Sequence, residues 1–209
     1  MNKAKVPLII FSILSLCVSF VSYFFAFFSS LALGGYGKLN IGATLEWFAS
    51  VLPVILILIY AIGFFRKPSG KILLIIIVAL QLFNIFDGTI ENVGVLLKME
   101  SYETFRLFLG TLGIIRNIFG MAVFIILLLY LLKVIKAKIP VTILTFVYII
   151  TTAIKGVFGT VINLFFNQFI YNIDVFNAYF IGSAFLSIIT AIFYLVTWLI
   201  FAKSALLKD

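Results

Sequence analysis

The chain has 209 residues, of which 65% are hydrophobic and 11% charged, and its mean hydropathy is +1.30. This composition excludes an ordinary soluble globular domain. The formal net charge of +8 does not indicate nucleic acid as a partner, because most of the basic residues are divided among four short segments and form no basic domain.

Long uncharged runs follow one another along the chain. No charged residue occurs between Lys5 and Lys38, and none occurs between Glu46 and Arg66. A helix needs about 20 mostly apolar residues to cross a bilayer, whereas the strands of a closed barrel are shorter and alternate in polarity. We predict an all-α, polytopic membrane bundle in which residues 1–209 form a single integral membrane domain. Its six transmembrane helices are expected at 6–33, 44–65, 71–92, 106–133, 139–166 and 175–203.

The loops between these helices alternate in the sign of their charge. Basic segments stay in the cytoplasm of most membrane proteins. We therefore predict that both termini are cytoplasmic, that the membrane is the cell membrane, and that anionic lipid headgroups attract the basic ends. The basic gaps contain Lys3, Lys5, Arg66, Lys67, Lys71, Lys133, Lys136, Lys138, Lys203 and Lys208, and the acidic residues in or beside the other gaps are Glu46, Asp87, Glu91, Glu100, Glu103 and Asp174.

Aromatic residues flank the predicted spans. Tryptophan and tyrosine are enriched where a membrane meets water, so we expect them to form two belts. The outer belt would contain Trp47, Tyr102 and Tyr171, and the inner belt Tyr60, Tyr130 and Trp198.

The first predicted helix carries small residues at alternating spacings of three and four, which is a heptad seam. In lipid, small residues let two helix backbones approach closely. The seam therefore predicts helix packing, either within the chain or against a second copy or a partner membrane subunit. Its members are Ser12, Ser15, Ser19, Ser22, Ala26 and Ser29.

Three charged residues lie inside the apolar segments. Asp87, Arg116 and Lys155 are each 16 or 17 residues from the lysine that marks the inner end of their helix. At a rise of about 1.5 Å per residue this distance is about 25 Å, in a hydrocarbon core of about 30 Å. We therefore predict one polar layer in the outer leaflet, to which Asn117 and Glu91 also belong.

Two interpretations of this layer are open, since a charge inside a membrane normally has a partner or faces a water-filled cavity. In the structural one, Asp87 or Glu91 pairs with Arg116 and Lys155, or the basic side chains extend to the outer surface. In the functional one, Arg116 and Lys155 bind the carboxylate or phosphate of a solute. Asp87 then holds their geometry or accepts an ammonium group, with Asn117 in the same site and Glu91 at its mouth.

Several kinds of chemistry are absent from the sequence. The chain has no histidine and one cysteine, which removes the usual haem, zinc and histidine-activated nucleophile sites. It also lacks a glycine-rich phosphate loop followed by lysine and a hydroxyl residue. We therefore expect no metal, no cofactor and no enzymatic activity.

The sequence predicts a multi-pass membrane protein that binds or transports a small anionic or zwitterionic solute, alone or as the membrane subunit of a larger transporter. The alternative is a non-catalytic membrane scaffold, immunity or assembly protein. In size and helix number the chain is similar to the membrane-embedded substrate-binding subunits of energy-coupling-factor transporters and to small bacterial immunity proteins, although no motif selects either.

Overall fold

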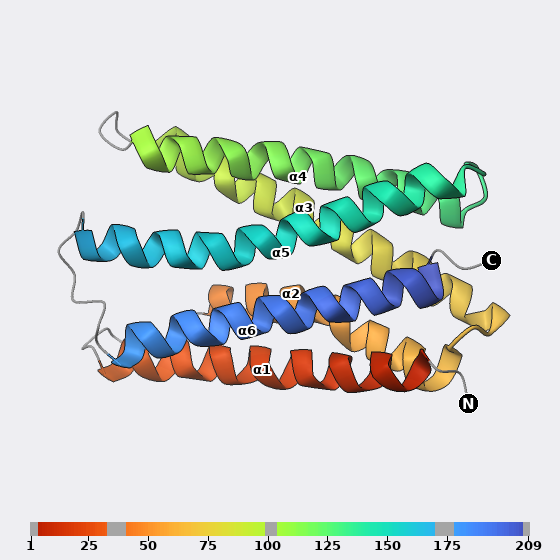
Figure 1. Cartoon of the computed structure of the whole chain (residues 1–209), viewed down its shortest axis with the longest axis horizontal. Helices are drawn as coiled ribbons and strands as arrows, with labels where there is room; N and C mark the ends of the chain where they lie inside the picture. Colours follow the sequence, from red (N-terminus) through yellow and green to blue (C-terminus); the bar gives the residue numbers. More distant parts are fainter. Residues whose placement is uncertain (1–3, 33–40, 99–103, 170–177, 207–209) are drawn as a thin grey trace. The chain divides into compact units, whose positions relative to one another are not determined.

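A computed structural model describes residues 4–32, 41–98, 104–169 and 178–206 (Figure 1). Within these ranges the chain is helical and contains no strand, which confirms the all-α class. Six of its helices are long and apolar enough to cross a membrane. They are α1 (Lys5–Ala32), α2 (Ile41–Ile59), α3 (Lys71–Lys98), α4 (Thr104–Leu131), α5 (Lys138–Phe169) and α6 (Ala178–Phe201).

The end of the third helix was predicted too early. α3 continues to Lys98 instead of ending at residue 92. The prediction followed the apolar run, but a helix needs only its backbone hydrogen bonds and residues of adequate helix propensity.

The chain divides into two compact units, one made of Met1–Arg66 with Ile149–Asp209 and the other of Lys67–Tyr148. In the first unit α1 packs against α6 and α2, and in the second α3 packs against α4 (Figure 1). α5 begins in the second unit and ends in the first.

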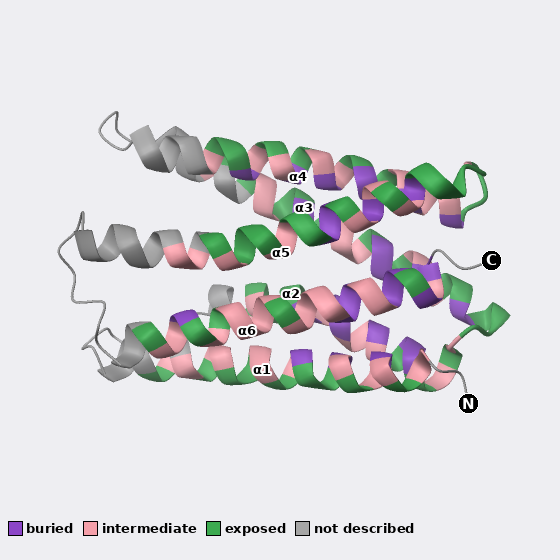
Figure 2. Ribbon diagram, viewed as in Figure 1, coloured by how far each residue is buried: buried purple, intermediate pink, exposed green. Residues whose placement is uncertain are grey.

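Each of the six long helices exposes large apolar side chains, and Figure 2 shows exposed residues along all of them. This pattern is the opposite of a soluble protein, in which large apolar side chains are mostly covered. It is the pattern expected where lipid contacts the helices. One exposed member from each helix in turn is Phe28, Leu45, Phe83, Ile115, Phe158 and Phe185.

Two residues expected in the inner aromatic belt are core residues instead. Tyr60 and Trp198 are each 2% exposed. Both meet the ring of Phe201 edge-on, at centroid distances of 5.9 Å and 5.6 Å. Aromatic edge-to-face packing stabilises a core beyond the apolar area that it buries. The prediction was wrong because composition alone does not tell a lipid-facing ring from a protein-facing one.

α2 and α6 both end in a π-helical turn, Tyr60–Phe64 and Ala202–Leu206. After the first of these turns, Arg66 adopts a left-handed conformation (φ 59°), and its backbone N–H donates to the Tyr60 hydroxyl at 3.1 Å. The Ile62 carbonyl accepts a hydrogen bond from Lys5 Nζ at 3.1 Å. The beginning of α1 is thereby joined to the end of α2.

α4 ends in a Schellman motif. Val134 N–H donates to the Leu129 carbonyl and Lys133 N–H donates to the Tyr130 carbonyl, both at 2.9 Å. Lys133 is left-handed, with φ 64°. This hydrogen bonding determines the direction in which the chain leaves α4 toward α5.

Candidate functional site

The packing of α3 against α4 places Asp87 and Arg116 at the same height along the two helices. A Cβ atom on Gly88 of α3 would lie 3.9 Å from Asn117 Nδ2 of α4. Asn117 is 3% exposed, so its amide is enclosed where the two helices meet. Gly88 follows Asp87 and Asn117 follows Arg116, so these two charged residues flank the same contact. The equal depth that the sequence predicts for Asp87 and Arg116 agrees with this register.

Arg116 is half-buried and turns toward its own neighbour. Its Nε and Nη2 both donate to Asn117 Oδ1, at 3.2 Å and 2.6 Å. The buried amide therefore holds the guanidinium group on the surface of α4. A neutral amide oxygen satisfies two N–H groups, but it carries no charge to balance the arginine.

Asp87 does not take part in this arrangement. Its side chain is exposed and forms no hydrogen bond or ion pair with any described residue. The Asp87–Arg116 ion pair of the structural interpretation is therefore not formed. Sequence spacing predicts the level of a charged residue along its helix but not the direction of its long side chain.

The remaining predicted residues are placed separately. Lys155 is exposed on the part of α5 that belongs to the first unit, beside Gly156. A Cβ on Gly156 would lie 3.2 Å from the Ala191 Cβ, so α5 passes close to α6 there. Glu91 lies one turn beyond Asp87 on α3, and its side chain is outside the described residues. The membership of Lys155 and Glu91 in one layer with Arg116 stays a prediction.

Gly88 is the residue that the sequence reasoning missed. It marks the position on α3 that faces the Asn117 amide, where even a Cβ would make only an ordinary contact at 3.9 Å. The sequence contained one signal for this residue, namely a glycine next to Asp87 in the predicted polar layer. It was weak because glycine is frequent in membrane helices for many packing reasons.

The small-residue seam of α1 is covered within the chain along its first half. Ser12 and Ser15 are 0% and 1% exposed, and their Oγ atoms have no hydrogen-bond partner among the described residues. Trp47 Nε1 of α2 donates to the Ser19 carbonyl at 3.3 Å. Ser19 and Ser22 are half-buried, whereas the side chains of Ala26 and Ser29 are outside the described residues.

Among the described residues, no three histidine, cysteine or acidic side chains gather where they could hold a metal ion. The hairpin of α3 and α4 instead presents a guanidinium group, a buried amide and an exposed carboxylate. These groups suit the binding of a charged solute better than nucleophilic or redox chemistry. No known protein family, curated protein or solved structure matches the chain.

Proposed function

We propose that this chain is a multi-pass protein of the cell membrane, with both termini in the cytoplasm, that binds or transports a small anionic or zwitterionic solute. It acts alone or as the membrane subunit of a larger transporter. The six apolar helices and the basic residues at alternate helix ends support the membrane placement.

The observation that carries the proposal is that the Arg116 guanidinium donates its hydrogen bonds to a neutral amide. Two of the five N–H groups of a guanidinium are used on the neutral Asn117 oxygen, and no described carboxylate balances the charge. A charge inside the hydrocarbon core normally has a charged partner or reaches water. A bound carboxylate or phosphate would balance this charge, and it would do so with the paired hydrogen bonds that arginine favours.

Asp87 extends the proposal to zwitterions. Its exposed carboxylate flanks the same Gly88–Asn117 contact and is available to the ammonium group of a solute. Lys155, the second cation that the sequence predicts for this layer, lies in the first unit, and its part in solute binding stays a prediction.

A ligand screen tests this function. Small carboxylates, phosphates and amino acids are added to the purified protein, and thermal unfolding is followed for the wild type, Arg116→Gln and Arg116→Lys. A ligand at 100 times its Kd stabilises a protein by about 2.7 kcal/mol. We expect such a ligand for the wild type, no response in Arg116→Gln and a reduced response in Arg116→Lys.

Arg66→Gln is the matched control, because it removes an exposed arginine charge from a residue that belongs to neither α3 nor α4. It should respond to the ligand as the wild type does. A stabilising ligand that acts equally on Arg116→Gln would refute the proposed site.

A second candidate function is the non-catalytic scaffold, immunity or assembly protein. The enclosed Asn117 amide favours it, since a polar group between two membrane helices also strengthens their packing. No ligand response in the wild type, together with a large loss of stability in Arg116→Gln, would favour this candidate.

A further inference from the structure

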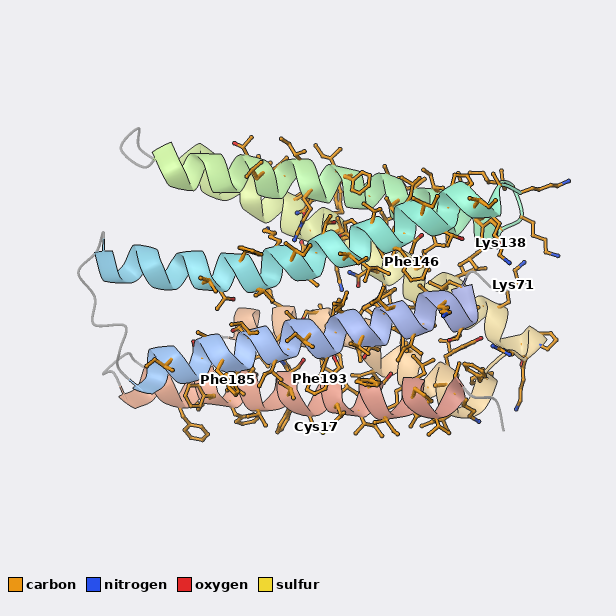
Figure 3. The ribbon with its side chains drawn as sticks, viewed as in Figure 1. Cys17, Lys71, Lys138, Phe146, Phe185 and Phe193 are labelled. Atoms are coloured by element: carbon orange, nitrogen blue, oxygen red, sulfur yellow. The ribbon has the colours of Figure 1, made fainter. Side chains whose placement is uncertain are left out.

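One end of the second unit gathers five lysines, which we call the lysine end: Lys67, Lys71, Lys133, Lys136 and Lys138. All five are exposed. Because Gly88 of α3 is level with Asn117 of α4, the antiparallel helices place Lys71 level with the end of α4. Figure 3 shows Lys71 and Lys138 at the same end. Asp87, the nearest acidic residue along α3, is about 24 Å away at 1.5 Å per residue.

Exposed aliphatic side chains are interspersed with Lys133, Lys136 and Lys138 from the end of α4 into the first turn of α5. Leu132 is 49% exposed, Val134 68% and Ile139 75%. Burying one such side chain is worth about 1.5–3 kcal/mol, so an aqueous loop would be expected to cover them. The alternation suits a membrane surface, where the aliphatic groups enter the acyl chains and the ammonium groups stay among the headgroups.

In the first unit, the basic side chains at the beginning of α1 and just after α2 are partly used within the protein. Lys5 Nζ donates to the Ile62 carbonyl, and the Arg66 guanidinium lies 5.2 Å from the centre of the Phe65 ring. The ammonium groups of Lys133 and Lys136 instead make no hydrogen bond or ion pair with any described residue. These two cations are thus available to an external anion.

We propose that the lysine end is a binding site for anionic phospholipid headgroups. Phosphate oxygens accept hydrogen bonds from Lys133 and Lys136, while Leu132, Val134 and Ile139 pack among the acyl chains of the same lipids. The Schellman motif at Lys133 holds this segment at a fixed angle to α4. The site goes beyond solute binding at Arg116 and depends only on the proposed membrane insertion.

Native mass spectrometry of the full chain, with phosphatidylglycerol competing against phosphatidylcholine, tests the proposal. The test variant is Lys133→Gln with Lys136→Gln, and the control is Arg66→Gln with Lys203→Gln. Each pair removes two exposed charges and includes one left-handed basic residue. A lysine at an anionic surface contributes about 1 kcal/mol, so the test pair should lower the preference for phosphatidylglycerol by roughly 30-fold.

The control pair should change this preference by much less, and replacing Lys133 and Lys136 with arginine should preserve it. An equal loss in both glutamine pairs would overturn the site, because the attraction would then be spread over all basic residues. An unchanged preference for phosphatidylglycerol in both pairs would also overturn the site and would favour an acidic protein as the partner of the lysine end. Glycerol phosphate that competes as well as the intact lipid would refute the role of the acyl chains.

Discussion

Replacing Gly120 with alanine tests the packing of α4 against the beginning of α5. A Cβ at this position would come within 2.6 Å of Tyr148 Cζ and 2.7 Å of its Oη, whereas ordinary contacts begin at 3.4 Å. The Tyr148 ring would therefore have to shift by roughly 1 Å to restore ordinary packing. Its freedom to do so is small, because Tyr148 is 4% exposed and meets the Phe124 ring edge-on at 5.6 Å.

Gly88→Ala is the matched comparison in the same unit. A Cβ there would lie 3.9 Å from Asn117 Nδ2, which is an ordinary contact. Alanine is favoured over glycine in a helix by about 1 kcal/mol, and this gain is common to both variants. The difference between them therefore measures the collision with Tyr148. Overpacking a core costs about 1–3 kcal/mol, so Gly120→Ala should be less stable than Gly88→Ala by about that amount.

The free energy of unfolding of both variants is measured in mixed micelles by titration with a denaturing detergent. Gly88→Ala should unfold at or above the wild-type midpoint, and Gly120→Ala clearly below its partner. Equal stability of the two variants would refute the close approach of α4 to Tyr148.

Three further predictions concern the first unit and the topology. Trp47→Phe should lose at least about 1 kcal/mol of stability in the same titration, since the hydrogen bond to the Ser19 carbonyl is lost and the smaller ring packs less against Tyr23; an unchanged midpoint would contradict that bond. Ser12→Ala should be neutral or stabilising, because the buried Oγ has no partner among the described residues; a loss above about 1 kcal/mol would reveal a partner. Ser69→Cys in a Cys17→Ser background should react with an impermeant maleimide only from the cytoplasmic side, and labelling from outside would reverse the proposed orientation.

The limits of sequence-based prediction are clearest at α3. The apolar run marks the part of the helix that suits lipid, whereas the helix itself continues to Lys98. The length of the apolar run is set by the thickness of the hydrocarbon core that it crosses. The length of the helix is set by how far its backbone hydrogen bonds continue. The predicted helices 44–65 and 175–203 reach into the π-helical turns that follow α2 and α6, but a hydropathy pattern does not tell a π-helical turn from an α-helical one.

The sequence by itself determined that the chain is helical, that six segments suit a membrane, and that Asp87 and Arg116 lie at similar heights. These features follow from local periodicity, charge spacing and the fixed rise of a helix. Only the tertiary structure decided that Gly88 faces Asn117, that Arg116 turns to Asn117 instead of Asp87, and that Tyr60 and Trp198 are buried. The physical reason is that these features depend on the direction of long side chains and on which distant segments pack together, and helix spacing contains neither.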